Sequence, residues 1–357
     1  MRDFESMIYT ESFDIEFDPV ANPESVVRGP GVRFTVLTPR LLRLEYSAEG
    51  GFEDRPSQAF WYRKQPVPQF EVREEEGRLF IETEYLLLRY EISDVGFLAD
   101  TLSVTLKETG AVWQYGQEDG LNLLGTARTL DNVDGALALE PGLMSREGWA
   151  VYNDAPPKAA GQNLVFDEQG WLAPRDREGL DLYFFGYGRD FQGCLRDFAA
   201  VAGAAPLLPR WALGNWWSRY WAYRDEELLA LMDEFRSHDV PLSVCIVDMD
   251  WHITDTGNAS SGWTGYTWNR ELFPDPPAFI AELHRRGLKT ALNLHPADGV
   301  WPHEAQYEAM AKRLGLEVDG KTPIAFDIAD PDFTRAYFEL LHHPKEIVGV
   351  DFWWIDW

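Results

Sequence analysis

The chain has 357 residues, of which 45% are hydrophobic and 14% aromatic, so it is long enough for two domains with substantial cores. Its 59 acidic and 32 basic residues give a formal net charge of −27. That charge argues against nucleic acids and anionic membranes as partners, because both require basic surfaces. The sequence contains no run of about 18 apolar residues, so it predicts no membrane-spanning helix. The first five residues lack the apolar stretch of a signal peptide, so we expect a cytoplasmic protein.

The first 205 residues have the pattern of an antiparallel β-sandwich. Short segments alternate apolar and polar residues and are separated by turn signals. The expected strands cover residues 33–38, 42–46, 79–83, 86–90 and 102–106, and one helix is expected near residues 190–201. We therefore expect a β-sandwich domain over residues 1–205.

The pattern changes after Pro206-Leu207-Leu208-Pro209, which has the composition of a linker. Strands and helices then alternate, as in a parallel sheet. The expected strands are 212–217, 242–248, 288–294 and 350–356, and helices are expected at 225–238, around 279–286, at 304–314 and at 332–341. Four strands predict the first half of a (β/α)8 TIM barrel over residues 206–357. A doubly wound open sheet is the alternative, but residues 218–221 lack the glycine-rich turn that usually opens it.

Polar and aromatic side chains gather where these strands end. Asp248 and Asp356 lie at the ends of strands two and four, and His295 and Trp221 follow strands three and one. Because side chains alternate along a strand, Asp248 and Asp250 are expected on one face, and so are Trp354 and Asp356. A barrel brings its strand ends together at one mouth, where such folds build their active sites. The sequence therefore predicts a site of acids, imidazole and indole rings.

Simpler interpretations apply to some of these residues. An Asp at a strand end is often a helix cap or a turn residue, which applies to Asp250 and Asp255. His295, directly before a proline, could be an ordinary loop residue. A metal site built from Asp248, Asp250 and the nearby histidines lacks any recognised ligand spacing, so we expect no metal and no cofactor.

Acids beside tryptophan rings in a barrel mouth fit glycoside hydrolysis. That reaction uses two carboxyl groups, one to attack or stabilise the anomeric carbon and one to protonate the leaving oxygen. Aromatic faces hold the apolar side of a sugar ring.

Several motifs resemble glycoside hydrolase family 31, the retaining α-glucosidases and α-xylosidases. Trp354-Ile355-Asp356 resembles the nucleophile signature of that family, and Val247-Asp248-Met249-Asp250-Trp251 resembles its strand-two segment. Further similar segments are 206–223, 262–269, 273–276 and, in the first domain, 52–57 and 125–131. The resemblance implies a galactose-mutarotase-like N-terminal sandwich and a TIM-barrel catalytic domain.

The resemblance also implies residue roles and an α-linked oligosaccharide or glycoside as the partner. Asp356 would be the nucleophile and Asp248 would bind sugar hydroxyls. Trp354 and Trp221 would line the same subsite, with His295 at its border. The acid/base residue of the family lies beyond strand four, and the usual methionine after the nucleophile is Trp357 here. We therefore expect the 357-residue polypeptide to be inactive alone and, with an apolar strand as its edge, poorly soluble.

An α-glucosidase is the leading interpretation. The alternatives are an α-xylosidase, an α-transglycosidase or an α-glucan lyase of the same family. A non-catalytic carbohydrate-binding protein is an alternative from another class, but the acids Asp248 and Asp356 argue against it.

Overall fold

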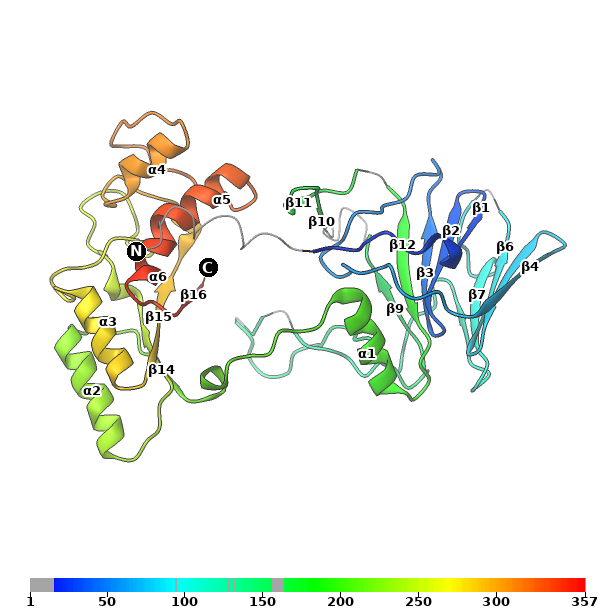
Figure 1. The fold of residues 1–357 in the computed structure, drawn as a ribbon, viewed down its shortest axis with the longest axis horizontal. Coiled ribbons are helices and arrows are strands. Elements are labelled where there is room, and N and C mark those ends of the chain that lie inside the picture. Colours follow the sequence, from blue (N-terminus) through cyan, green and yellow to red (C-terminus); the bar gives the residue numbers. More distant parts are fainter. Residues whose placement is uncertain are drawn as a thin grey trace. The chain divides into compact units, whose positions relative to one another are not determined.

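A computed structural model describes residues 16–93, 95–127, 129–130, 132–155, 164–176 and 178–356. The first five residues, Arg128, Asp131 and Trp357, which entered the interpretation of the sequence, lie outside the described residues. The chain divides into two compact units, residues 1–205 and 206–357. Each unit is described by itself below (Figure 1).

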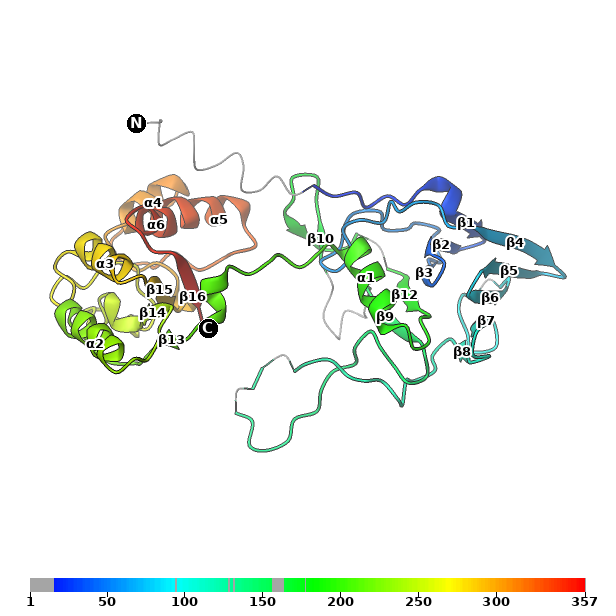
Figure 2. The same ribbon diagram turned by 60° about the horizontal axis from the view of Figure 1, so that its bottom comes forward.

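The first unit is built on two five-stranded antiparallel sheets, as the sequence predicts (Figures 1 and 2). One sheet has the order β1-β2-β3-β12-β9, with β1 Val26–Gly29, β2 Val32–Thr38, β3 Leu41–Tyr46, β12 Leu180–Phe185 and β9 Ala150–Asn153. The other has the order β4-β5-β6-β7-β8, with β4 Phe70–Glu75, β5 Arg78–Thr83, β6 Leu86–Glu91, β7 Leu102–Leu106 and β8 Val112–Gln114. The short strands β10 Val165–Phe166 and β11 Leu172–Ala173 pair separately, and helix α1 spans Phe191–Ala202.

The two large sheets share one hydrophobic core. Val32 and Phe34 of β2 belong to the same buried cluster as Leu79 and Ile81 of β5. These side chains occupy alternate positions, so one face of each strand contributes to the core. This packing explains the alternating pattern in the sequence.

The opposite face of β2 and β3 is also buried, although alternation predicts a solvated polar face. Arg33 Nε lies 2.6 Å from Glu45 Oε2, and Arg43 Nε lies 2.7 Å from Asp181 Oδ1. The register places Arg33 opposite Glu45 on the neighbouring strand. Charges can be buried here because each guanidinium meets a carboxylate in good geometry.

The second unit contains a four-stranded parallel sheet with the order β13-β14-β15-β16, as the alternating pattern predicts (Figures 1 and 2). Its strands are β13 Trp216–Trp217, β14 Val244–Val247, β15 Lys289–Leu294 and β16 Phe352–Ile355. Its helices are α2 Asp225–Ser237, α3 Pro276–Arg285, α4 Tyr307–Arg313, α5 Pro331–Tyr337 and α6 His343–Ile347.

Local sequence explains where these helices begin. Asp275 accepts a hydrogen bond from the Ala278 N–H, and Pro276 occupies the first helical position of α3, where its missing N–H costs nothing. Asp330 caps α5 in the same way, with a proline after it.

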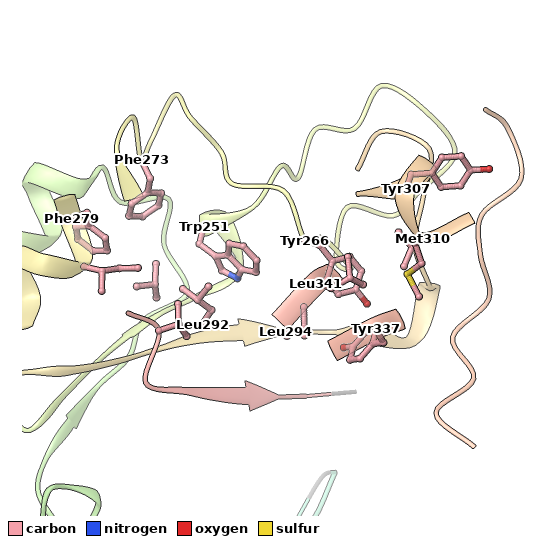
Figure 3. Packing of buried hydrophobic residues seen from close by; sticks show 14 of the residues in the cluster. Trp251, Tyr266, Phe273, Phe279, Leu292, Leu294, Tyr307, Met310, Tyr337 and Leu341 are labelled. Atoms are coloured by element: carbon pink, nitrogen blue, oxygen red, sulfur yellow. The ribbon is translucent and has the colours of Figure 1, made fainter. Parts of the chain in front are cut away.

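A single hydrophobic cluster joins the helices to one face of the sheet. Trp251, Tyr266 and Phe273, which follow β14, pack with Leu292 and Leu294 of β15 (Figure 3). Helices α2 to α5 contribute further buried side chains to the same cluster. The opposite face of the sheet carries a smaller cluster.

Several expected elements differ in the structure, among them the strand expected at 350–356, which spans Phe352–Ile355. Residues 212–217 do not form one strand, because a 3₁₀ turn covers Arg210–Leu213 and β13 contains only two residues. The strand expected at 242–248 ends at Val247. The helix expected at 332–341 is divided, since α5 ends at Tyr337 and a π-helical turn spans Phe338–His342. Within the described residues, every helix is too short or too polar for a bilayer crossing.

Candidate active site

One face of the parallel sheet leads toward the predicted site residues. On this face Ile246 lies beside Ala291, and Ala291 beside Phe352, in a small apolar cluster. One step toward the strand ends, Asn293 lies beside Trp354. Asp356 continues this alternation after Trp354, and its backbone N–H donates to the Leu294 carbonyl over 2.8 Å.

Asp356 follows the last residue of β16 and opens onto solvent. Its side chain is 52% exposed, and its Oδ2 lies 3.9 Å from His295 Nε2. His295 is buried, and its Nδ1 has no hydrogen-bond partner in the part of the chain that the structure describes. The predicted pair of Asp356 and His295 is therefore brought together at neighbouring strand ends.

These two residues line a depression of about 390 Å³ together with Ser261, Trp263 and Asp298. The Trp263 ring meets the His295 ring edge to face, with centroids 5.2 Å apart. A concave site with an aromatic wall and a few convergent polar groups is the usual form of a small-molecule site.

Asp248 and Trp221 line a second, smaller depression with Asp250. The Arg219 guanidinium lies over the Trp221 ring, 4.7 Å from its centroid. Trp354 lines neither depression. The structure therefore separates the five predicted residues into two groups, with Trp354 on the strand that leads to Asp356.

The strand-alternation argument for Asp248 and Asp250 is wrong, because β14 ends before both residues. Asp248 caps the 3₁₀ turn Met249–Trp251 and accepts a hydrogen bond from the Met249 N–H over 2.7 Å. Burial, followed by the nearby Asp248 carboxylate, raises the pKa of Asp250. The turn, and not an extended strand, places both acids at one depression.

Two loops build the walls of the larger depression. The β14–α3 loop covers residues 248–275 and the β15–α4 loop covers residues 295–306. The buried Thr264 hydroxyl donates to the His295 carbonyl and accepts from the Asp298 N–H. Ser261 Oγ donates to Asp298 Oδ2 over 2.6 Å. Trp263 and His295, on different loops, are thus held in one arrangement.

Glu304 joins the same two loops further from the depression. Its Oε2 accepts hydrogen bonds from the Tyr266 N–H over 3.1 Å and from the Thr267 hydroxyl over 2.5 Å. Its Oε1 lies 3.2 Å from His303 Nε2. Burial tends to raise the pKa of Glu304, but His303 and the Thr267 hydroxyl outweigh it and the pKa is lowered.

Several residues of this region were not predicted as site residues. Trp263 was noted only as part of a motif, and Ser261 and Asp298 were not singled out, since Asp298 lies two residues after Pro296 in a segment that resembles an ordinary turn. Asn293 is fully buried in β15, and neither polar atom of its side chain has a partner among the described residues. A polar residue inside the apolar segment Ala291-Leu292-Asn293-Leu294 was the available signal for Asn293.

The described residues contain no group of three or more His, Cys, Asp or Glu side chains arranged to hold a metal ion. The groups that are present, a half-exposed carboxylate, an imidazole and exposed indole rings, suit a neutral polyhydroxylated ligand.

Comparison with known proteins identifies the family of the second unit. Residues 205–357 match the model described as the Glycosyl hydrolases family 31 TIM-barrel domain. Residues 205–357 therefore belong to the TIM-barrel domain of glycoside hydrolase family 31.

Two curated relatives illustrate its range of similarity. An α-xylosidase of Saccharolobus solfataricus is 26% identical over 174 residues, which are 49% of this chain and 22% of that protein. Alpha-glucosidase 2 of Bacillus thermoamyloliquefaciens is 28% identical over 117 residues, which are 33% of this chain and 14% of that protein. The chain therefore spans a minor part of the length of these relatives.

A solved structure shows the same fold over most of the chain. The family 31 α-xylosidase from a soil metagenome, complexed with xylose, superposes with a TM-score of 0.63 and 19% identity. The superposition covers 93% of this chain and 56% of that one.

Proposed function

We propose that the protein containing this chain is a retaining, exo-acting α-glycosidase with Asp356 as its nucleophile. The observation that carries the proposal is the position of Asp356 at the C-terminal end of a parallel strand, exposed at a depression beside His295 and Trp263. Catalytic residues of barrel enzymes occupy such strand ends. Family membership supports the same chemistry.

The reaction has two steps. A carboxylate oxygen of Asp356 attacks the anomeric carbon, the bond to the leaving oxygen breaks, and a covalent glycosyl ester forms. The leaving oxygen takes a proton from a second carboxyl group, about 5–5.5 Å from the first in retaining enzymes. We place that acid beyond residue 357, as the family resemblance implies. Water then hydrolyses the ester with retention.

The other predicted residues have binding roles in this proposal. Asp248 accepts hydrogen bonds from sugar hydroxyls, and Trp221, Trp354 and His295 border the glycone. Residues 1–205 then form a galactose-mutarotase-like domain, and residues 206–357 form the first four βα units of an eight-stranded barrel. The two five-stranded sheets and the parallel four-stranded sheet support this division.

An α-glucosidase is our first candidate, on an α-linked glucoside. An α-xylosidase is the second, because a curated relative and a solved structure with the same fold carry that name. Comparing hydrolysis of 4-nitrophenyl α-glucoside with that of the α-xyloside distinguishes them, since only glucose carries the C6 hydroxymethyl group.

A trapping experiment tests the role of Asp356. The natural polypeptide that includes residues 1–357 is incubated with 5-fluoro-α-glucosyl fluoride or its xylosyl analogue, and its peptides are analysed by mass spectrometry. We expect the glycosyl label on the peptide carrying Asp356. Asp356→Ala should lower kcat/KM on the order of a thousandfold or more, because the covalent intermediate cannot form without the attacking carboxylate.

Asp255→Asn is the matched control, since Asp255 is an exposed acid of the β14–α3 loop that lines neither depression. It should keep wild-type activity. A label on another carboxylate, or near-normal turnover by Asp356→Ala, would refute the assignment.

A further inference from the structure

Two exposed aromatic rings have no role in the reaction described above: Trp263 at the rim of the larger depression, and Tyr220 stacked on it. Trp263, on the β14–α3 loop, is 46% exposed, and Tyr220, on the segment after β13, is 64% exposed. Their rings stack with centroids 6.4 Å apart and planes inclined by 28°. The two rings come from separate segments of the chain.

Burial distinguishes these rings from His295, the buried side chain of the depression. His295 is 5% exposed and lies 3.9 Å from the half-exposed Asp356 carboxylate, whereas Trp263 and Tyr220 are open to solvent. In an exo-acting site the sugar that carries the reacting carbon enters first and occupies the floor. The group bonded to that carbon then lies toward the rim, where the two rings are.

The rim has the chemistry that recognises a sugar ring. An indole face packs against the C–H side of a pyranose, and Trp combines a large apolar area with few rotatable bonds. Ser261 and Asp298 lie at the same depression and supply a hydroxyl and a carboxylate for sugar hydroxyl groups. A small leaving group such as fluoride would reach none of these side chains.

Trp263 is also held before any ligand binds. Its ring contacts His295 on one side and Tyr220 on another, and its backbone N–H donates to Ser261 Oγ over 3.3 Å. The next residue, Thr264, is hydrogen-bonded to the β15–α4 loop at two points. A preorganised ring loses little conformational entropy on binding, so its contact contributes more to affinity.

We propose that Trp263, with Tyr220 beside it, binds the leaving-group sugar and makes the enzyme selective for glycosides whose aglycone is itself a carbohydrate ring. This inference rests on the proposed glycosidase function. It adds a residue that determines the preferred leaving group and takes no part in bond breaking.

The test compares two substrates that share a glycone. Maltose and α-glucosyl fluoride form one pair, and isoprimeverose and α-xylosyl fluoride form the other; the pair with the better wild-type glycone is used. For Trp263→Ala we expect kcat/KM on the disaccharide to fall about tenfold or more, equivalent to about 1.4 kcal/mol. On the fluoride it should change less than about threefold. Because both values come from one preparation, their ratio does not depend on the fraction of folded enzyme.

Three further variants sharpen the result. Trp263→Phe keeps an aromatic face and should retain most of the disaccharide activity. Tyr220→Ala should show a smaller loss of the same kind. Leu316→Ala removes an exposed apolar side chain of the same unit outside the depression and should leave both activities unchanged.

The outcomes separate the two proposals. Equal losses on disaccharide and fluoride would overturn the inference, because they would place Trp263 against the glycone. An unchanged ratio with full activity would overturn it as well. If the wild-type protein hydrolyses neither substrate of either pair, the proposed function itself fails.

Discussion

At the scale of single residues, one hydroxyl group has an unusually large role. Thr264 is buried, donates to the His295 carbonyl and accepts from the Asp298 N–H. It thereby satisfies two backbone groups of the β15–α4 loop. A buried backbone group that loses its partner costs about 1–3 kcal/mol.

Thr264→Val should therefore lower both stability and activity, although valine has almost the same shape. We expect a lower Tm in calorimetry and a fall in kcat/KM, because His295 and Trp263 lose their common support. Thr264→Ser keeps the hydroxyl and should recover most of both. Equal behaviour of the serine and valine variants would show that the hydroxyl does not hold the loops.

At the scale of secondary-structure elements, the π-helical turn Phe338–His342 supports the strand that carries Asp356. The His342 ring lies 4.2 Å from the Trp353 ring, and Trp353 Nε1 donates to Glu346 over 2.8 Å. Neither ring nitrogen of His342 has a hydrogen-bond partner among the described residues. Burial, followed by the nearby Lys345 and His343 charges, lowers the pKa of His342 to about 3.

This lowered pKa predicts acid sensitivity. As pH falls below about 6.5, His342 becomes protonated in the unfolded chain but stays neutral in the folded protein. The free energy of unfolding therefore decreases as pH falls from about 6.5 to about 3. His342→Phe cannot take up that proton. The Tm of the variant minus that of wild type, measured by calorimetry between pH 8 and pH 4, should rise as pH falls through 6.5. A difference independent of pH would contradict this expectation.

Element types were largely predictable from the sequence, whereas their ends and their contacts were not. The alternating period of residues 78–106 and the helical period of residues 225–237 reflect burial on one side of the element, which a sequence records directly. β14 ends where it does because Asp248 caps a turn. An Asp after an apolar run is compatible with the end of a strand and with a capped turn, so the sequence does not distinguish the two. Trp263 reaches His295 only because a long loop folds back, and such contacts between distant residues leave no periodic signal.

At the scale of the whole molecule, the first unit combines an apolar core with a charged one. The face of β2, β3 and β12 opposite the shared core holds guanidinium and carboxylate groups in contact. Arg43 reaches Asp181 over 2.7 Å and Glu45 over 3.1 Å, and both carboxylates are buried. Although burial opposes its ionisation, the Arg43 charge keeps the pKa of Asp181 below its usual range. The sequence shows these charges but not the register that pairs them.

Arg43→Leu should destabilise the protein by about 3 kcal/mol, the lower end for breaking a buried ion pair. Each buried carboxylate loses one guanidinium partner, although Glu45 keeps Arg33 and Asp181 keeps Arg175. Arg73→Leu is the matched control. Arg73 is half exposed on β4 and contacts Glu75 and Glu82 at 3.4 and 3.2 Å, and exposed pairs contribute about 0–1 kcal/mol. Calorimetric Tm values for both variants test the contrast. If both variants lowered the Tm by a similar small amount, the buried carboxylates would not depend on Arg43 for their stability.

The hydrogen bonds between the β14–α3 and β15–α4 loops also constrain how this protein can be re-engineered. Thr264 and Glu304 make each loop part of the fold of the other. Transplanting residues 248–275 alone into a related barrel would separate Thr264 and Thr267 from their acceptors. Residues 248–275 and 295–306 should therefore be exchanged together. In libraries of chimeras made to vary the preferred leaving group, the crossover points should lie outside these two loops.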